Sequence, residues 1–366
     1  MACYNASPYT CTYDSGGGKD YTAFGTFEID SDNDLAGYSG PVILNCYDSQ
    51  VHDDYIRMDG STNTSNTVHR KIQSAPGCSV IWSGKSGTGA NFYVVNSIAS
   101  NVFYSNEPYA VFKNLAAKIV RALAGTLCCF SNYNGSGGSK YLNCLAYESS
   151  NTTDGQVAGG IYFSHISNNT VIAYNCIVRN CSGRGYYHYA LYGTEFNASV
   201  CCTAISCSGG GFYTYGASGT AIVYSCYAAN NTGVDFRESY WDAPSGWNAS
   251  KDNTADLGGG AGNNYKNGLD LSLDADGFPV NATNLYGSAG TGENWGRNPY
   301  DDFVAVSDLL DFLKNDTSGW TESKKDIRGT DRPTPDTADV SWAVGAAEYV
   351  EPSPLAGGSD PMMWIF

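Results

Sequence analysis

Charged side chains gather at one place in the repeated part of the chain, and their types could break a glycosidic bond. The cluster comprises Asp235, Arg237, Glu238 and Asp242. Hydrolysis uses two carboxyl groups about 5 to 9.5 Å apart, whereas elimination uses Asp-bound calcium with an Arg or Lys base. The simpler interpretation, which we favour, is a solvent-facing loop with a local ion pair. Whether the protein is an enzyme, and whether it would be a lyase or a glycoside hydrolase, stays open.

Aromatic side chains offer a second kind of chemistry, the binding of sugars. The segments Tyr186–Tyr192 and Phe212–Tyr215 occupy matching positions of a repeat, so Tyr187 should lie beside Tyr213 and Tyr189 beside Tyr215. Facing solvent, such columns would form a flat strip that contacts the apolar faces of sugar rings. Trp241 is a further candidate for the same role. Inward stacking of these rings explains the pattern equally simply.

Other reaction classes find little support in the residue pattern. His52 and His165 have no Ser or Cys partner in a nucleophile-elbow context, which argues against a hydrolase triad. The cysteines form no CxxC pair of the kind that binds zinc. We therefore expect neither a metal nor a cofactor.

The charge balance bears on partners. The 366 residues include 20 basic and 36 acidic side chains, giving a net charge of -16, the wrong sign for neutralising phosphates or anionic lipid. The most apolar stretch, residues 110–125, contains Lys113, Lys118 and Arg121, so it does not read as a membrane span. We expect no nucleic-acid partner and no membrane insertion.

The elements that would position these residues are predicted by a repeat. Cys144, Cys176, Cys202 and Cys226 each sit in a similar stretch, with intervals of 32, 26 and 24 residues. Small or apolar residues stand two before, at and two after each cysteine, which predicts one strand through it with all three side chains facing a core. An Asn or Ser and a Gly that follow predict a corner. Periods of 20 to 50 residues are typical of solenoids.

The cysteines have two possible roles in such a repeat. There are thirteen, an odd number, and those of the repeat fall in register. We therefore favour a ladder of buried, reduced thiols over a disulfide framework.

These patterns predict an all-β fold, a right-handed parallel β-helix over residues 1–350 with an opening coil at about 1–60 and a closing coil at about 320–350. Residues 301–314 have the spacing of a short amphipathic helix. Residues 351–366 read as a linker and an apolar tail. Exposed apolar side chains at a chain end suggest an assembly contact, here made by Met362, Met363, Trp364, Ile365 and Phe366.

Both ends of the chain resemble known β-helix proteins. Asp326-Ile-Arg-Gly-Thr-Asp-Arg-Pro, followed by Gly345-Ala-Ala-Glu-Tyr, is similar to the closing coil of the pectate-lyase-like superfamily. Gly17-Gly-Lys-Asp-Tyr-Thr-Ala-Phe resembles the opening coil of β-helix proteins common in bacteriophage and environmental bacterial genomes. That superfamily includes lyases, hydrolases, adhesins and virion parts, so the resemblance implies a fold more than a function.

A phage-like opening coil without a secretory signal at Met1-Ala-Cys-Tyr leads us to expect a bacteriophage virion surface protein released by host lysis. It would be a tail fibre, spike or capsid decoration. Its expected partners are host polysaccharide, other virion proteins and copies of itself, a trimer by resemblance to phage spikes. The alternatives are a polysaccharide-degrading enzyme of the same fold, and a bacterial adhesin at the cell surface or outside the cell.

Overall fold

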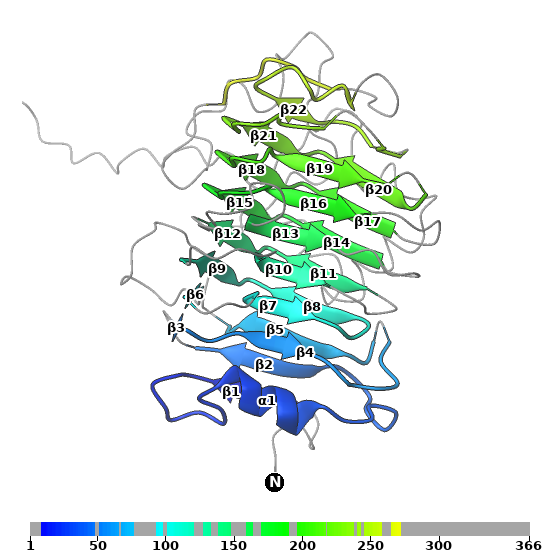
Figure 1. Ribbon diagram of the computed structural model, residues 1–366. Coiled ribbons are helices and arrows are strands. Elements are labelled where there is room, and N and C mark those ends of the chain that lie inside the picture. The colour runs from blue at the N-terminus through cyan, green and yellow to red at the C-terminus, as the bar shows by residue number, and fades with distance from the viewer. Residues whose placement is uncertain are drawn as a thin grey trace, which may run out of the picture.

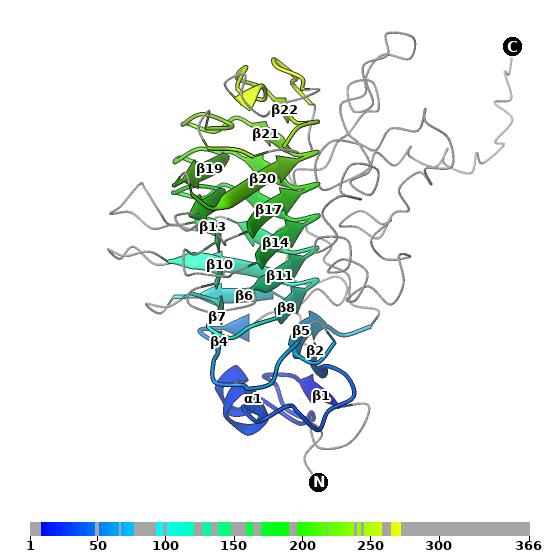
Figure 2. The same cartoon turned by 90° about the vertical axis from the view of Figure 1, so that its right-hand side faces the viewer.

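A computed structural model describes a stack of short strands that forms a rod (Figure 1). The described residues are 9–47, 51–65, 67–76, 93–97, 101–120, 127–132, 138–147, 159–163, 170–189, 196–216, 218–237, 240–242, 245–257 and 265–271. Figure 2 shows the strands rising as a ladder from helix α1 (Phe24–Ser31) to the last strand. None of the described helical residues forms a segment long and apolar enough to cross a membrane.

The strands belong to three sheets, and every paired neighbour runs parallel. Sheet 1 contains β1 (Thr10–Tyr13), β2 (Val42–Cys46), β5 (Arg70–Ser74), β8 (Ala110–Lys113), β11 (Ser139–Leu142), β14 (Thr170–Tyr174), β17 (Phe196–Val200) and β20 (Thr220–Tyr224). Sheet 2 contains β4 (Ile56–Met58), β7 (Phe103–Ser105), β10 (Cys128–Asn132), β13 (Gly159–Phe163), β16 (Tyr186–Tyr189) and β19 (Phe212–Tyr215). Sheet 3 contains β3 (Val51–His52), β6 (Tyr93–Asn96), β9 (Ala116–Ile119), β12 (Leu145–Tyr147), β15 (Ile177–Arg179), β18 (Thr203–Ile205), β21 (Tyr227–Ala229) and β22 (Ala249–Ser250).

Each turn of the chain, called a coil below, visits sheet 1, then sheet 3, then sheet 2. In one coil these visits are β14, β15 and β16, after which the chain returns to sheet 1 as β17. Parallel pairing of like strands from successive coils defines a parallel β-solenoid, which confirms the predicted fold class. The predicted helix at 301–314, the closing coil and the tail at 351–366 lie outside the described residues.

A sharp corner stands immediately before each cysteine of the repeat. Asn143, Asn175, Cys201 and Ser225 adopt left-handed backbone conformations with φ between 51° and 55°. Short polar side chains tolerate this region better than β-branched ones do. A corner also follows Cys176, Cys202 and Cys226, where Asn180, Ser206 and Asn230 have φ of 53°, 55° and 57°. The positive φ falls on these residues and not, as predicted, on Gly183, Gly209 and Gly233.

The corner before the cysteine corrects the predicted strand. The chain does not run straight through Cys176: β14 ends at Tyr174 and β15 begins at Ile177. The cysteines and the residues two after them do face the main core, as predicted. The residues two before them belong instead to a second apolar cluster, on the outer face of sheet 1: Leu142, Tyr174, Val200 and Tyr224. All four are buried, so this face of sheet 1 is not a solvent surface.

The cysteine thiols form the predicted ladder, and each also forms hydrogen bonds between coils. The Cys176 Sγ accepts a hydrogen bond from the Cys144 amide at 3.4 Å and contacts the Tyr141 carbonyl at 3.2 Å. In the last copy Asn248 takes the cysteine's place: its Oδ1 accepts from the Cys226 amide at 2.9 Å and its Nδ2 donates to the Val223 carbonyl at 3.1 Å. A cysteine thiol and an asparagine side-chain amide thus make equivalent hydrogen bonds to the preceding coil at successive positions of one column.

Ten cysteines of the described chain, including Cys144, Cys176, Cys202 and Cys226, are buried and free. Cys11 departs from this pattern, because it is disulfide-bonded to a partner outside the described residues. The expectation of reduced thiols therefore holds for the repeat but not for the N-terminal strand.

Helix α1 was not predicted, because its segment was taken for part of an opening coil. It lies against β4, the edge strand of sheet 2, where the Asp59 amide donates to Glu28 Oε1 at 3.1 Å. Phe24 and Phe27, three positions apart, are both fully buried. Covering an edge strand in this way prevents pairing with other chains.

A buried arginine fastens α1 to the coils. Arg70 on β5 is fully buried and forms an ion pair with Glu107 and a second one with Glu28, at 3.3 Å. It also donates to the Glu28 carbonyl at 3.2 Å and to the Asp59 carbonyl at 3.0 Å. The guanidinium of Arg70 thus has two carboxylate partners and two carbonyl acceptors, which offset the free-energy cost of burying its charge.

We expect the repeat cysteines to resist alkylation in the native state. Burial raises the pKa of the Cys128 thiol to about 12 and raises those of Cys176, Cys202 and Cys226 well above the ordinary value, so little thiolate forms at pH 8. Alkylation at pH 8 should become complete only on denaturation, as intact-protein mass spectrometry would show. Fast native labelling of Cys176 or Cys202 would contradict the ladder.

The corner at Ser206 supplies a test of backbone strain. Ser206→Val should lower the free energy of unfolding by about 1 to 2 kcal/mol, because a β-branched residue disfavours positive φ, whereas Ser206→Gly should be nearly neutral. Urea unfolding followed by circular dichroism measures both. Equal stability of the two variants would show that the corner relaxes.

Candidate functional site

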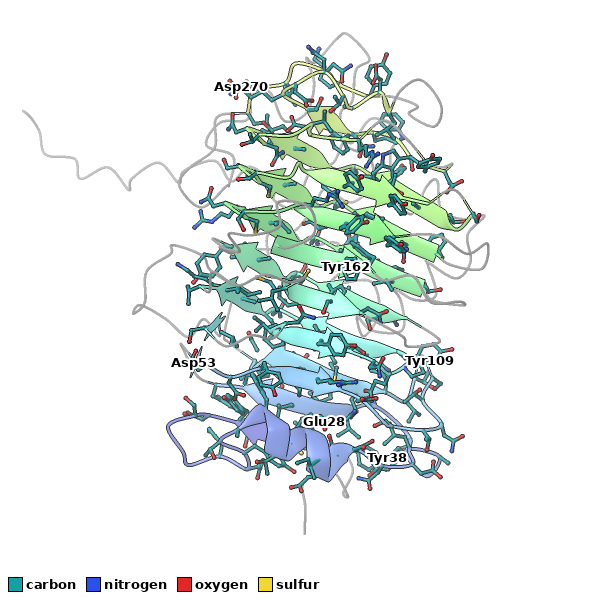
Figure 3. The ribbon with its side chains drawn as sticks, in the orientation of Figure 1. Glu28, Tyr38, Asp53, Tyr109, Tyr162 and Asp270 are labelled. Atoms are coloured by element: carbon teal, nitrogen blue, oxygen red, sulfur yellow. The ribbon has the colours of Figure 1, made fainter. Side chains whose placement is uncertain are left out.

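One column of outward-facing side chains runs up sheet 2. Alternation along β16 places Tyr186 in the core and Tyr187 outside, as expected for side chains of a strand. The strand registers align the outward residues of successive coils, here called the outer column: Arg57, Tyr104, Ser131, Tyr162, Tyr187 and Tyr213. Figure 3 shows Tyr162 about half-way up the stack.

The upper part of this column is aromatic. The tyrosine strip, as we call it, consists of Tyr162, Tyr187, Tyr189, Tyr213 and Tyr215. Tyr187 pairs with Tyr213 and Tyr189 with Tyr215 in the strand register, as predicted, with ring centroids 5.2 Å and 5.1 Å apart. Tyr162 extends the strip by one coil, 5.4 Å from Tyr187. Tyr162 was not predicted as part of the strip, although a tyrosine one coil before Tyr187 was a usable signal.

The strip lies outside the main core, and the exposure of its tyrosines increases from Tyr162 and Tyr187 to Tyr215. Tyr187 is 7% exposed, Tyr189 and Tyr213 are half-buried, and Tyr215 is 45% exposed. The Tyr189 and Tyr215 rings are stacked, with an angle of 18° between their planes. The strip tyrosines thus lie outside the main core, but Tyr162 and Tyr187 are only 9% and 7% exposed and the Tyr187 and Tyr213 rings meet at 74°, so the rings do not form the flat solvent-facing strip that one alternative required.

Two arginines lie over the strip. The Arg184 guanidinium carbon is 3.4 Å from the centroid of Tyr213 and 4.4 Å from that of Tyr187. The Arg237 guanidinium carbon is 4.1 Å from the same Tyr213 ring. Such cation–π contacts are favourable when the cation is partly desolvated. Arg184 was not singled out from the sequence, because the Ser182-Gly183-Arg184-Gly185 turn gives no sign of where its side chain lies.

Burial and neighbouring rings, and not ion pairs with described carboxylates, set the electrostatics of the two arginines. Burial lowers the pKa of Arg184, and the positive charge of Arg237 lowers it further, whereas Tyr187 raises it. Burial raises the pKa of Tyr187, opposed by Arg184. Within the described parts of the chain neither arginine forms an ion pair. The local ion pair expected for Arg237 is therefore replaced by stacking on Tyr213.

Asp235, the central catalytic candidate, is an internal structural residue. It is 1% exposed, and its Oδ1 accepts a hydrogen bond from Asn231 Nδ2 at 2.7 Å. Its Oδ2 accepts from the backbone amides of Lys251 and Asp252 at 3.0 Å and 3.3 Å. Burial raises the pKa of Asp235, and the bond from Asn231 opposes that shift. The expectation that this carboxylate faces solvent is wrong, because it joins one coil to the next.

The other candidates do not converge on Asp235. Asp242 Oδ2 accepts from the Ala221 amide at 2.8 Å at the start of β20. Trp241 is buried, donates its indole N–H to the Arg237 carbonyl at 2.6 Å and so does not line the tyrosine strip. Glu238 lies outside the described residues. A catalytic role for these residues stays a prediction.

A Ser–His pair that was not predicted from the sequence lies in the core behind the strip. His188 Nε2 is 2.9 Å from Ser199 Oγ, and both side chains are fully buried. Burial lowers the pKa of His188 to about 3, against the effect of the Asn197 carbonyl, so the ring is neutral at physiological pH. Phe163 stacks on it at 4.1 Å. A neutral ring closed off from substrate in this way serves packing, not nucleophilic chemistry.

No three His, Cys, Asp or Glu side chains come together to hold a metal ion in the described part of the chain. Comparisons of the sequence with models of known families and with curated proteins, and of the fold with solved structures, found no match. The tyrosine strip with its two arginines is therefore the candidate site on geometric grounds alone.

The buried position of Asp235 has a measurable consequence. Asp235→Ala should lower the free energy of unfolding by roughly 3 kcal/mol, because it leaves Asn231 and two backbone amides without an acceptor. Asp242→Ala, which removes one bond at a more exposed site, is the matched control and should cost clearly less. Chemical unfolding of both variants decides the point, and a smaller effect at Asp235 would contradict a structural role.

Proposed function

We propose that this chain is a β-solenoid attachment protein that binds surface glycans through the tyrosine strip, and that it is displayed on a bacteriophage particle as a tail fibre, spike or capsid decoration. The observation that carries the glycan part is the outward orientation of paired tyrosines on successive strands of sheet 2. The resemblance of both chain ends to β-helix proteins, including phage ones, supports the virion part.

The shape of the strip suits an extended saccharide. Neighbouring strands of a sheet lie about 4.8 Å apart, so β13, β16 and β19 present aromatic side chains at regular intervals along the rod. A sugar ring places its apolar face on an aromatic ring while its hydroxyls remain free to hydrogen-bond. Because Tyr162 and Tyr187 are largely covered, a saccharide would contact mainly Tyr189, Tyr213 and Tyr215, on two neighbouring strands.

Attachment is favoured over cleavage by what the candidate carboxylates do. One oxygen of Asp235 and one of Asp242 accept hydrogen bonds from backbone amides, and the other oxygen of Asp235 accepts from Asn231, so both residues have structural roles that do not require catalysis. A depolymerase of the same fold and a bacterial adhesin are the competing functions. Assembly into a homo-oligomer, a trimer by resemblance, through residues 362–366 belongs to the same proposal, as do contacts with other virion proteins.

An array of bacterial capsular polysaccharides and lipopolysaccharides tests the proposal. The full-length protein should bind a subset of the array, and the double variant Tyr189→Ala with Tyr215→Ala should bind it roughly tenfold more weakly, since each lost aromatic contact is worth about 0.5 to 1.5 kcal/mol. Tyr265→Ala is the matched control, because Tyr265 is 48% exposed and lies outside the strip. Its affinity should equal that of the unmodified protein.

Other outcomes separate the competing functions. Release of oligosaccharides during incubation, detected by mass spectrometry, would favour the depolymerase. Equal binding by the strip variant and the control would remove the strip from recognition. Binding to no glycan at all would reject attachment through sugars.

A further inference from the structure

We infer that residues 272–319 of this chain fold back along the rod and cover the outer face of sheet 1, with their carboxylates paired to lysines of that face. The inference concerns a different sheet from the tyrosine strip and does not depend on glycan binding. It rests on three observations: the burial of an outward-facing surface, the lysines within that surface, and the distribution of carboxylates along the chain.

The outer face of sheet 1 is buried, although no described helix or strand packs across it. The strand registers arrange its side chains in two columns, which we call the covered face: Lys71, Val111, Lys140, Ile172, Ala198 and Ile222 in one, and Lys113, Leu142, Tyr174, Val200 and Tyr224 in the other. None of these side chains is more than 8% exposed. Such burial requires other atoms to lie over the face.

The cover comes from the same chain, because a single copy of the protein already buries the covered face. Phe196 and Trp247 are the described side chains that pack against its apolar part. Both lie near β17 and β20, so the part nearer β5 has its cover elsewhere in the chain. The face therefore needs no second copy and no other partner.

Three lysines lie within the part of the face nearer β5. Lys71, Lys113 and Lys140 are 8%, 7% and 0% exposed. A buried ammonium group is costly without a compensating charge, and each of these lysines does take part in an interaction. None of the ion pairs between described residues includes them. We therefore place their carboxylate partners in the part of the chain outside the described residues.

Short stretches next to the strands of sheet 1 have too few carboxylates for this role. The stretches adjacent to β5, β11, β14 and β17 contain a single acidic residue, Glu195; they are residues 77–92, 133–137, 164–169 and 190–195. Glu195 directly precedes β17, two coils away from Lys140 on β11. One carboxylate at that distance does not compensate three lysines.

Residues 272–319 have the composition that the covered face requires. They contain eight acidic and two basic side chains, whereas residues 320–350, where a closing coil is predicted, contain six acidic and four basic ones. Within the first segment, residues 301–314 have apolar side chains at helical spacing. The segment thus offers negative charge for the lysines and apolar side chains for the rest of the face.

The segment can reach the whole face. The described chain ends near the upper end of the rod, where the Leu271 amide donates to the Tyr227 hydroxyl on β21 at 3.1 Å. From β20 to β5 there are five steps between neighbouring strands, or about 24 Å at 4.8 Å a step. A segment of 48 residues spans about 70 Å even when fully helical. A cover of this kind confines ligands and other copies to the remaining faces of the rod.

The experiment measures the acetylation rate of each lysine in the full-length protein with an N-hydroxysuccinimide ester, followed by peptide mass spectrometry. Lys71, Lys113 and Lys140 should react slowly, whereas Lys251, whose side chain is 40% exposed, should react fast. The double variant Phe303→Asp with Leu310→Asp should release the segment and raise the three slow rates about tenfold or more, because local opening exposes the lysines.

The apolar tail provides the matched control. Met362→Asp with Ile365→Asp introduces the same two charges outside the segment and should leave every lysine rate unchanged. Far-UV circular dichroism verifies that both double variants keep the rod.

Cross-linking of the unmodified protein gives a second readout that needs no variant. A carbodiimide joins an amine directly to a carboxylate in contact with it, so it should link the three lysines to acidic residues of 272–319 within one copy. Lys251 and Asp270, paired at 3.0 Å, are the internal standard.

Several results would overturn the inference. One is fast acetylation of the three lysines in the unmodified protein. Another is unchanged protection in the Phe303→Asp, Leu310→Asp variant when it retains the rod, or equal release in the tail control, since either would assign the cover to another segment. If that variant loses the rod, cross-linking decides: links from the three lysines only to other segments, only between isotope-labelled and unlabelled copies, or not at all while Lys251 joins Asp270, would each reject residues 272–319 as the cover.

Discussion

Everything in this solenoid depends on the hydrogen bonds that join one coil to the next at its corners. A left-handed residue at each corner turns the chain sharply and interrupts the regular ladder of a sheet. The side chain that follows restores the connection. The Cys176 thiol accepts a hydrogen bond from the Cys144 amide and contacts the Tyr141 carbonyl. At the last position of the same column, the side-chain amide of Asn248 accepts from the Cys226 amide and donates to the Val223 carbonyl. A buried backbone group left unpaired would cost about as much as such a bond contributes.

The second corner follows the same rule with the same two residue types. Cys181 and Cys207 occupy adjacent coils there, and Asn231 occupies the next. Asn231 accepts from the Cys207 amide at 2.8 Å and donates to the Ala204 carbonyl at 3.3 Å. It also donates to Asp235, which is why that carboxylate is buried. A residue that looked catalytic in the sequence is thus part of the corner that closes a coil.

Sequence patterns predicted the columns better than the corners. The intervals between Cys144, Cys176, Cys202 and Cys226 predicted the stacking, because in-register parallel pairing forces like residues onto like positions. The bend before each cysteine escaped notice, since alternating apolar residues look the same whether a strand continues or turns. Only the recurring Asn or Ser at that position pointed to it, and the corner residue Cys201 breaks even that signal.

The residues of the candidate site that lie in strands were predicted, whereas the residue that lies in a turn was not. The pairs Tyr187 with Tyr213 and Tyr189 with Tyr215 followed from the repeat, because they sit in strands. Arg184 did not, because it comes from a turn whose side-chain direction the repeat does not determine. Arg237 was noticed for its charge but was expected in a local ion pair, with catalysis as the alternative, because the sequence alone does not show that it stacks on Tyr213.

The charge of the strip differs from the charge of the molecule as a whole. The chain has a net charge of -16, yet Arg184 and Arg237 form no ion pair in the described structure and lie against the Tyr213 ring, at 3.4 Å and 4.1 Å from its centroid. An aromatic face attracts a cation most strongly where water is partly excluded. The aromatic rings of the strip therefore hold these two positive charges in place of carboxylates.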